Sequence, residues 1–361
     1  MQPSLLRIVV LAGVVSLIGV RSSNECLAQV QSVFPEQEWL VKSPSDVGLN
    51  APKLNEMSEY LGGIGCVVRQ GYLVHTWGDA AQRTDIASCC KPWYAHFLFK
   101  AIEDGRLKGL EERVVDVEPR LAELNPSLQH KDRDIRWRHL VTQTSCYGVS
   151  ERPGEAFDYS DYNMALLFDN LFFKVNGSTS ESVTNDVLHK QLTDLLMCQD
   201  EPRFNAKGRL AVSPRDFARF GLLYLRGGEW RGRRLLSESS VQRLLATPLP
   251  ASLPRSSGKP AEMIPGQRSI GGGSNQTDHH GSYSFTWWTN GLDRNRQRHW
   301  PAIPHDTVGA FGHKGKRALV LVPGLDLIVV WNDAAIDSPA REARALQLLL
   351  GAVSDSISSV P

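Results

Sequence analysis

Strand-rich stretches lie near both ends of this 361-residue chain, and the residues between them are mostly helical in character. Residues 66–80 and 317–333 each contain two β-rich runs joined by a turn, at Gly71 and at Pro323-Gly324 respectively. Strands from the two ends of a chain commonly pair in one antiparallel sheet. We therefore predict an α/β fold in which helices flank such a sheet and the helical middle forms an inserted all-α lobe.

The order of elements also predicts where the lobes begin and end. The α/β lobe is expected to comprise residues 47–105 and 282–361, and the helical lobe residues 106–281. Residues 249–282 are rich in Pro, Gly and Ser and predict a long loop, which is uncommon unless it is functional or mobile. Helices are predicted at residues 53–61, 88–105, 135–144 and 160–174, from Ser213-Pro214 to Gly227, and after Ser338-Pro339.

The first residues differ from the rest of the chain. Arg7 precedes a short apolar run at residues 8–20, and small residues follow a few positions later. The run is shorter than the ~20 apolar residues that a spanning helix needs, so residues 1–28 are predicted to be a secretory signal peptide rather than a membrane anchor. We expect an exported protein, periplasmic or secreted and not bound to a membrane, with residues 29–46 as an extension before a domain at 47–361.

Charge excludes one class of partner. The formal net charge is +1 at pH 7, and long runs of one charge sign are absent. Nucleic-acid binding is therefore not expected, because the chain lacks the electrostatic footprint that a polyanion requires.

The stretch "ASCCKPW" holds two candidate pairs, Cys89 with Cys90 and Ser88 with Lys91. Neighbouring cysteines cannot easily supply two ligands of one tetrahedral metal site, and neither belongs to a C-x-x-C redox motif, so a packing role is predicted. An odd number of cysteines remains after the predicted signal peptide, so at least one should be free or pair between chains. A disulfide from one of these two to Cys146 stays open.

Pro92 places Ser88 and Lys91 in the first turn of the helix predicted at 88–105, because proline is tolerated only near a helix start. Positions three apart share a helix face, so the lysine amine can lie near the serine hydroxyl and accept its proton. A second S-x-x-K match at residues 256–259 is rejected because it lies in the long loop without an amphipathic helix.

Two other stretches carry groups that suit such a nucleophile. Tyr159 stands just before a predicted helix, and a tyrosine hydroxyl beside a lysine ammonium is easier to ionise and can relay protons. His313, Lys314 and Gly315 precede a strand, where a glycine lets the backbone approach a ligand closely. The N–H of Lys316 can then help to hold an oxyanion. The alternatives are a half-buried loop tyrosine and a basic strand edge that discourages pairing between molecules.

These three motifs, in this order, resemble those of the serine β-lactamase and penicillin-binding-protein superfamily, in its class C-like branch. That family combines S-x-x-K with Y-x-N or S-x-N and with K-T-G or H-x-G. The corresponding stretches here are residues 88–91, 159–161 and 313–315. Peripheral stretches such as "KAIEDGRL", "SYSFTWWTN" and "VPGLDLIVVW" are similar as well, so the resemblance covers roughly residue 47 to the C-terminal helix. It implies the two-lobed fold of β-lactamases and transpeptidases.

The resemblance implies a role for each matched residue. Ser88 would be the nucleophile that forms an acyl-enzyme, and Lys91 its base or proton relay. Tyr159 would protonate the leaving group and activate water. The N–H groups of Ser88 and Lys316 would form the oxyanion hole, and His313 would shape the electrostatics around Tyr159. The implied substrate-binding residues are Asp161, His313, Lys314, Gly315 and Lys316. The implied substrate is a small-molecule or peptide-like acyl compound, and no cofactor or metal is expected.

The sequence departs from the family pattern at three places. Asp161 replaces the usual asparagine, and an ionised carboxylate only accepts hydrogen bonds whereas an amide also donates. We expect Asp161 either to cap the following helix or to have its charge balanced by Lys314. Lys314 itself replaces a small residue, and "TQTSCYG" replaces a stretch that usually ends in a glycine after the serine. These departures argue against an efficient antibiotic-resistance enzyme.

Three hypotheses of different classes follow. The first is an exported serine hydrolase that acts on an ester or amide, as an esterase, a D-amino-acid peptidase or a β-lactamase-like enzyme, since the fold does not choose among these. The second is a non-catalytic binding protein on the same scaffold. The third, a thiol or metal protein built on Cys89 and Cys90, has the least support.

Overall fold

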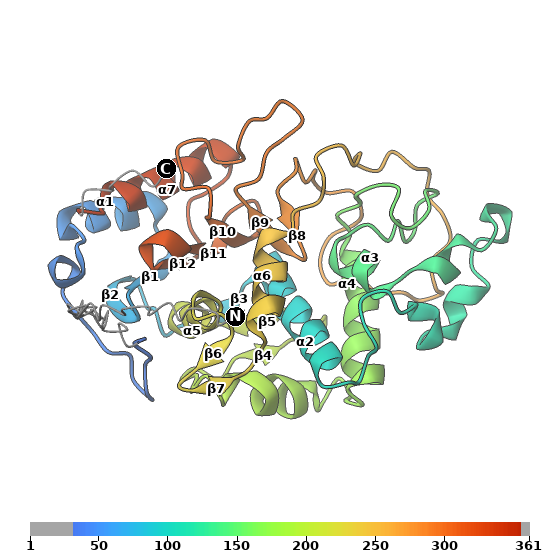
Figure 1. The fold of residues 1–361 in the computed structure, drawn as a ribbon, viewed down its shortest axis with the longest axis horizontal. Helices are drawn as coiled ribbons and strands as arrows, with labels where there is room; N and C mark the ends of the chain where they lie inside the picture. Colours follow the sequence, from blue (N-terminus) through green and yellow to red (C-terminus); the bar gives the residue numbers. More distant parts are fainter. Residues whose placement is uncertain (1–31, 355–361) are drawn as a thin grey trace, which may run out of the picture. The chain divides into compact units, whose positions relative to one another are not determined.

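The computed structural model describes residues 32–354, which are drawn in colour in Figure 1. The predicted signal peptide, residues 1–28, and residues 29–31 of the predicted extension lie outside the described residues. Within the described part, Val41 forms a parallel bridge with Leu73, so the extension is attached to the edge of the main sheet.

Strands from both ends of the chain form one seven-stranded sheet in the order β2-β1-β12-β11-β10-β9-β8. Every neighbouring pair is antiparallel. The strands are β1 (Ile64–Arg69), β2 (Tyr72–Trp77), β8 (Tyr283–Ser284), β9 (Trp287–Thr289), β10 (Val308–Gly312), β11 (Arg317–Val322) and β12 (Leu327–Asn332). The predicted fold, with one antiparallel sheet built from both chain ends and flanked by helices, is therefore confirmed.

Seven α-helices are found among the described residues. They are α1 (Ala51–Leu61), α2 (Lys91–Glu103), α3 (Trp137–Val141), α4 (Asp161–Phe168), α5 (Pro214–Leu225), α6 (Glu238–Ala246) and α7 (Pro339–Gly351). The predicted helix at 160–174 continues beyond α4 as a π-helical segment, Asp169–Val175. α5 begins as predicted, because Ser213 caps it by accepting a hydrogen bond from Asp216 N and Pro214 stands at its first position.

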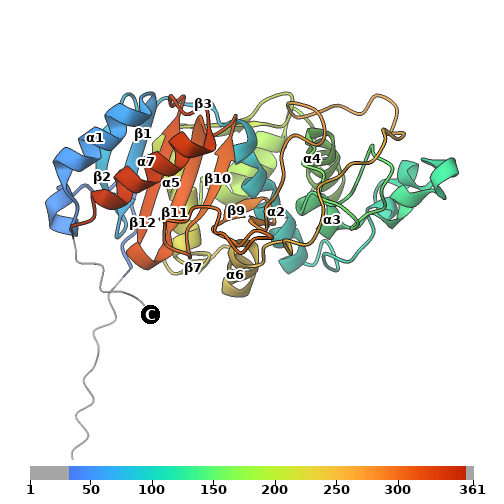
Figure 2. The same cartoon turned by 90° about the horizontal axis from the view of Figure 1, so that it is seen from above.

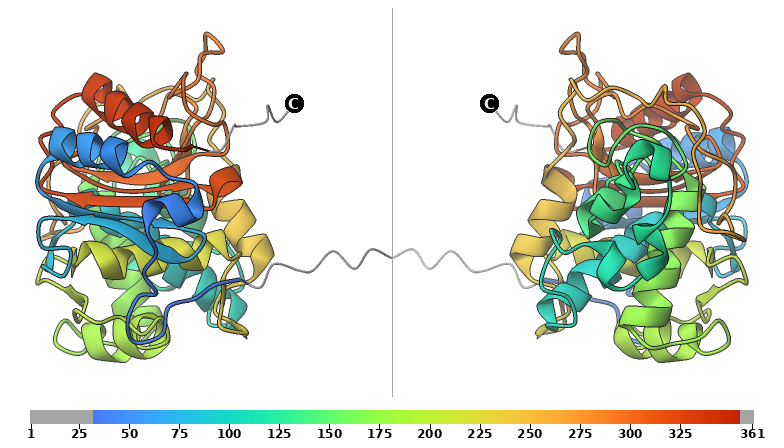
Figure 3. Two further views of the ribbon diagram at one scale, coloured as in Figure 1. Left: turned by 90° about the vertical axis from the view of Figure 1, so that its left-hand side faces the viewer. Right: turned by 90° about the vertical axis from the view of Figure 1, so that its right-hand side faces the viewer.

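Both faces of the sheet are covered by helices. α1 and α7 lie across one face (Figure 2), and their apolar residues pack against Val67, Val320 and Val329. α5 covers the other face, where Leu319 and Leu321 belong to the larger core cluster (Figure 3). Neighbouring strand residues point to opposite faces, so these runs of buried aliphatic residues serve two cores at once.

The middle of the chain is not purely helical. It also carries short strands, which are β4 (Arg203–Phe204), β5 (Leu210–Val212), β6 (Glu229–Trp230) and β7 (Arg233–Arg234). β5 pairs with β4 and with β3 (Thr84–Asp85), which leads directly into the segment that contains Ser88. The middle of the chain thus helps to hold that segment in place.

Candidate active site

Ser88 lies in a short 3-10 turn, Ala87–Cys90, that runs directly into α2. The carboxylate of Asp85 accepts a hydrogen bond from Ala87 N at 2.7 Å and so ties the turn to β3. Ala87 has a φ of +50°, a left-handed conformation that is unfavourable for a residue with a Cβ. Backbone strain of this kind persists only where contacts with the surrounding structure hold it in place. Here the strained turn places Ser88 at the N-terminal end of α2.

Gly312 allows β10 to approach the Ser88 turn closely. A Cβ at this position would lie 2.7 Å from Ile86 O and 3.1 Å from Ser88 N, so a larger residue would push the turn away. β10 pairs with β9 only through Val308 and Gly309. The rest of its edge therefore carries no strand partner in the described residues and lies beside Ser88 N.

Cys89 and Cys90 point into the core beside this turn. Cys89 Sγ lies 3.2 Å from Arg317 O and 3.3 Å from Ala310 O, and Cys90 Sγ contacts Tyr94 Oη at 3.4 Å. Both are fully buried, and burial raises the pKa of each thiol, that of Cys90 to about 11. Such thiols are poor nucleophiles, which agrees with the packing role predicted for them.

Lys91 lies at the centre of the candidate site. Its Nζ donates three hydrogen bonds of 2.8 Å each, to Ser88 Oγ, Tyr159 Oη and Asp161 Oδ1. An ammonium group has three N–H donors and no acceptor, so these contacts use all of its donors. Lys91 is only 1% exposed, and its ion pair with Asp161 is therefore almost completely shielded from water.

Asp161 is held in a different way from either expectation. Ser160, not Asp161, caps α4 by accepting a hydrogen bond from Asn163 N. The charge of Asp161 is balanced by Lys91 rather than by Lys314. Its second oxygen, Oδ2, accepts a hydrogen bond of 2.6 Å from Gly272 N in the long loop. The carboxylate thus lies between a backbone amide and the buried ammonium.

The surroundings determine the protonation of the three groups. Burial alone lowers the pKa of Lys91, but Tyr159 and Asp161 outweigh it, so the pKa lies above its ordinary value. Burial raises the pKa of the Tyr159 hydroxyl even though Lys91 acts against this. Burial also opposes ionisation of Asp161, but Lys91 and the Gly272 amide prevail and lower its pKa. At neutral pH the site therefore holds an ammonium, a neutral phenol and a carboxylate.

The third predicted motif lies at the tip of the hairpin between β10 and β11. The side chains of His313, Lys314 and Lys316 are exposed there, and none is hydrogen-bonded to Ser88, Lys91 or Tyr159 in the described structure. At this tip His313 Nδ1 accepts a hydrogen bond from Arg317 Nη1 at 2.9 Å, Lys316 N donates to His313 O at 3.4 Å, and Lys316 O accepts from Ala334 N at 3.0 Å.

Gly315 makes its close approach on the opposite side of the sheet from Ser88. A Cβ there would lie 2.7 Å from Ile336 Cγ2 and 3.0 Å from Glu342 Oε2, and its carbonyl accepts a hydrogen bond from Trp331. The structure thus brings together Ser88, Lys91, Tyr159 and Asp161 but not the side chains of the third motif. Gly312, rather than Gly315, is the glycine whose backbone closely approaches Ser88.

Sequence reasoning missed Gly312 and Gly272. Gly312 stands directly before His313, so a glycine at the end of β10 was a visible signal. Gly272 belongs to a run of three glycines in the long loop, but nothing in that pattern indicates which carboxylate its amide will bind.

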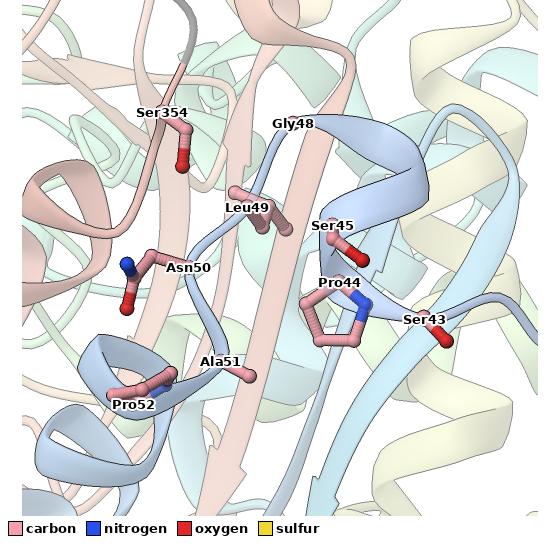
Figure 4. Close-up of a pocket in the computed structure, with 9 residues that line it drawn as sticks. All are labelled: Ser43, Pro44, Ser45, Gly48, Leu49, Asn50, Ala51, Pro52 and Ser354. Carbon is pink, nitrogen blue, oxygen red and sulfur yellow. The ribbon is translucent and has the colours of Figure 1, made fainter.

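The pocket drawn in Figure 4 lies away from these residues, beside the start of α1. It is lined by Ser43, Pro44, Ser45, Gly48, Leu49, Asn50, Ala51, Pro52 and Ser354. None of these residues has a side chain that can act as an acid or base near neutral pH. The titratable groups Lys91, Tyr159 and Asp161 converge instead beside Ser88.

Other features of the described residues bear on the remaining hypotheses. The free thiols are Cys66, Cys89, Cys90, Cys146 and Cys198, so the disulfide left open for Cys146 is not formed. Residues 32–354 contain no group of three or more His, Cys, Asp or Glu side chains arranged to hold a metal ion. None of the helices in this same span is both long and apolar enough to cross a bilayer.

Solved structures share this fold. A putative 6-aminohexanoate-dimer hydrolase from Bacillus anthracis aligns with a TM-score of 0.61 at 14% identity, over 89% of this chain and 88% of that chain. A β-lactamase from Mycobacterium bovis gives a TM-score of 0.56 at 18% identity, over 84% and 97% of the two chains. A class C β-lactamase gives 0.55 at 11% identity, over 88% and 96%. At such identities the likeness shows the fold alone.

Comparison with curated proteins gives no sequence match. The sequence profile of one family, described as Beta-lactamase, matches residues 53–350 and so spans both the Ser88 turn and the whole sheet. The chain belongs to the Beta-lactamase family.

Proposed function

We propose that this protein is an exported serine hydrolase that forms an acyl-enzyme on Ser88 and cleaves an ester or amide. One observation carries the proposal: the amine of Lys91 lies 2.8 Å from both Ser88 Oγ and Tyr159 Oη. The base is thus within direct hydrogen-bond reach of both the nucleophile and the proton relay, which is the geometry that nucleophilic catalysis requires.

Acylation requires Lys91 to lose a proton first, because its ammonium form has no lone pair. The neutral amine then accepts the proton of Ser88 while Oγ attacks the carbonyl carbon of the substrate. The carbonyl oxygen becomes an oxyanion beside Ser88 N and the open edge of β10. Lys91 returns a proton through Tyr159 to the leaving group as its bond to the acyl carbon breaks.

Deacylation uses the same groups in reverse. Water attacks the acyl carbon, and Tyr159 accepts a proton from the water while it donates its own hydroxyl proton to neutral Lys91. The bond from the acyl carbon to Ser88 Oγ then breaks, and Ser88 regains its proton as the carboxylic acid leaves.

The N–H of Lys316 is directed to His313 O, so we assign the second oxyanion donor to the open edge of β10 instead.

The protonation of Lys91 favours esters over amides as substrates, because the two classes differ in how much their leaving groups need a proton. Asp161 keeps Lys91 charged, so the neutral base is scarce at neutral pH. An acidic alcohol or phenol leaves an ester with little protonation, whereas the amine of an amide does not leave without a proton. A small acyl ester is therefore the proposed substrate class, and the place of action outside the cytoplasm rests on the predicted signal peptide.

A second candidate is a binding protein without turnover. The observation in its favour is the Lys91 ammonium, whose N–H groups are all hydrogen-bonded. It donates to Ser88 but cannot accept the proton of Ser88. The two candidates differ in whether Ser88 becomes acylated at any pH at which the protein remains folded.

A fluorophosphonate probe tests the proposal directly. We expect covalent labelling of Ser88 that becomes faster from pH 7 to pH 10, because loss of the Lys91 proton activates the nucleophile. Mass spectrometry of peptides would place the adduct, and a protein with intact circular dichroism but no adduct across this range would support the binding protein instead. An adduct on another residue would disprove the assignment of Ser88.

The variant Asp161→Asn is expected to move the rising limb of the acylation rate to lower pH. In the wild type both oxygens of Asp161 accept hydrogen bonds, from Lys91 and from Gly272 N. The asparagine side chain has one oxygen and one NH₂ group, so it can pair with Gly272 N and Lys91 together only if Lys91 is neutral. Since the carboxylate raises the pKa of Lys91, its removal should lower the midpoint by about one to three pH units.

Asp169→Asn is the matched control for this variant. Asp169 follows the end of α4, and its carboxylate pairs with Arg268 at 2.6 Å rather than with Lys91. The rate profile should keep its midpoint in this control. An unchanged midpoint in Asp161→Asn would show that Asp161 does not govern the base.

A further inference from the structure

Residues 270–276, in the middle of the long loop, run alongside residues 159–161. Three backbone hydrogen bonds join the two segments: Ile270 N to Asp161 O at 3.2 Å, Asp161 N to Gly273 O at 3.1 Å and Gln276 N to Tyr159 O at 3.2 Å. The loop therefore holds the backbone of Tyr159 and Asp161, the two residues of this segment whose side chains contact Lys91.

The same loop holds the side chain of Asp161. Gly272 N donates to Oδ2 at 2.6 Å while Oδ1 accepts from Lys91 at 2.8 Å. Hydrogen bonds to an ionised acceptor are shorter and stronger than those between neutral groups. The two contacts therefore fix the orientation of the carboxylate, with one oxygen directed to the loop and the other to the lysine.

Gly271 is required here because of space. A Cβ on Gly271 would lie 2.7 Å from Asp161 Oδ2 and 3.4 Å from Arg209 Nη1. Its φ lies outside the left-handed region, so alanine could adopt this backbone but would collide with the carboxylate. Gly273, two residues later, has open space around the corresponding position, with no atom within 4 Å.

We infer that residues 271–272 form a positioning element for the catalytic lysine. The Gly272 amide holds the carboxylate of Asp161 through its hydrogen bond, and the carboxylate in turn holds Lys91 Nζ between Ser88 and Tyr159. The catalytic meaning of this contact rests on the proposed function. The contact itself is a property of the folded chain and can be tested without turnover.

The loop also reaches the turn that presents the nucleophile. Arg209, which lies beside Gly271, forms an ion pair with Asp85. Asp85 in turn accepts the hydrogen bond from Ala87 N next to Ser88. A loop with no regular secondary structure therefore contacts the supports of both the nucleophile and the base, which gives the glycine run a role that its sequence alone did not reveal.

The variant Gly271→Ala tests the positioning element. The new methyl group should displace Oδ2 and lengthen the contact between Asp161 and Lys91. Loss of a close opposite charge lowers the pKa of an amine, so Lys91 should release its proton about one pH unit or more below the wild-type midpoint. The measurement is NMR titration of ¹³Cε-labelled lysine, with Lys91 assigned by its loss from the spectrum of Lys91→Met.

Gly273→Ala is the matched control, because it adds the same methyl group to the same glycine run in open space. It should leave the titration of Lys91 as in the wild type. Equal shifts in the two variants, or no shift in Gly271→Ala, would overturn the inference. In the background of Asp161→Asn, Gly271→Ala should add no further shift, since there is no charge left to displace.

A second measurement protects the test against misfolding of Gly271→Ala. In the wild type, the amide proton of Gly272 should follow the protonation of Asp161 on acidification, with a midpoint below the ordinary range for aspartate. The transition should vanish in Asp161→Asn, and the amide of Gly273 should not show it. A Gly272 amide that ignores Asp161 would overturn the inference, whereas a failure of Ser88 to be labelled would overturn only the proposed function.

Discussion

Ser88→Ala is expected to abolish acylation by an activated ester or a fluorophosphonate. Removal of a catalytic nucleophile costs roughly 10⁴- to 10⁶-fold in rate, and no other hydroxyl except that of Tyr159 contacts Lys91 Nζ in the described structure. The fold should persist, because the Ser88 side chain is small and only half-buried. Intact-protein mass spectrometry after incubation with the probe measures the loss.

Ser256→Ala is the control for this variant, since Ser256 belongs to the second S-x-x-K match. Its Oγ lies 3.2 Å from Glu151 Oε1 rather than beside a lysine amine. Labelling should proceed at the wild-type rate in this control. Persistent labelling of Ser88→Ala, at the wild-type stoichiometry, would refute the assignment of the nucleophile.

Lys91→Met should remove both acylation and a large part of the stability. Methionine keeps the apolar stem, but Asp161 is then left as a buried carboxylate without a cation. Breaking a buried ion pair in this way costs about 3–5 kcal/mol of unfolding free energy. Because burial without Lys91 raises the pKa of Asp161, the deficit should shrink as pH falls and the carboxylate becomes protonated. Urea unfolding at pH 5 and pH 8 measures this difference.

Two further variants separate the stability effect from the catalytic one. Lys91→Met with Asp161→Asn removes the uncompensated charge, so stability should largely return while acylation stays absent. Lys190→Met breaks the exposed pair with Asp186 and should leave the unfolding free energy almost unchanged, because water already screens such a pair. A Lys91→Met protein that still acylates rapidly would show that another group accepts the Ser88 proton.

Much of the fold follows from local sequence pattern. The two hairpins near the chain ends are marked by β-rich runs around Gly71 and Pro323-Gly324, and they are neighbours in the sheet through β1 and β12. Pro92 marks the start of α2, as predicted, and Lys91 lies in its first turn. Ser88 was predicted in the same turn but lies in the 3-10 turn that precedes the helix. The hairpins and the helix start depend on residues close in sequence, which is why the sequence could predict them.

The rest depends on contacts between distant segments. The direction of the Asp161 side chain is decided by residues 270–272, more than a hundred positions away along the chain, and no local rule distinguishes a capping aspartate from one paired with a buried lysine. The side chains of the third motif lie at a hairpin tip because β10 ends at Gly312 and the chain turns directly after it. The strands β4 to β7 contain too few residues for periodicity to mark them.

The pairing of β1 with β12 has a consequence for biosynthesis. The first strands of the sheet leave the ribosome long before their partner does, so their edge has no native neighbour during most of synthesis. Sheets with such high contact order fold slowly, because distant segments must meet before any pairing is rewarded. Until then the apolar runs of β1 and β2 are exposed to aggregation. The complete sheet can therefore form only after β12 has been made.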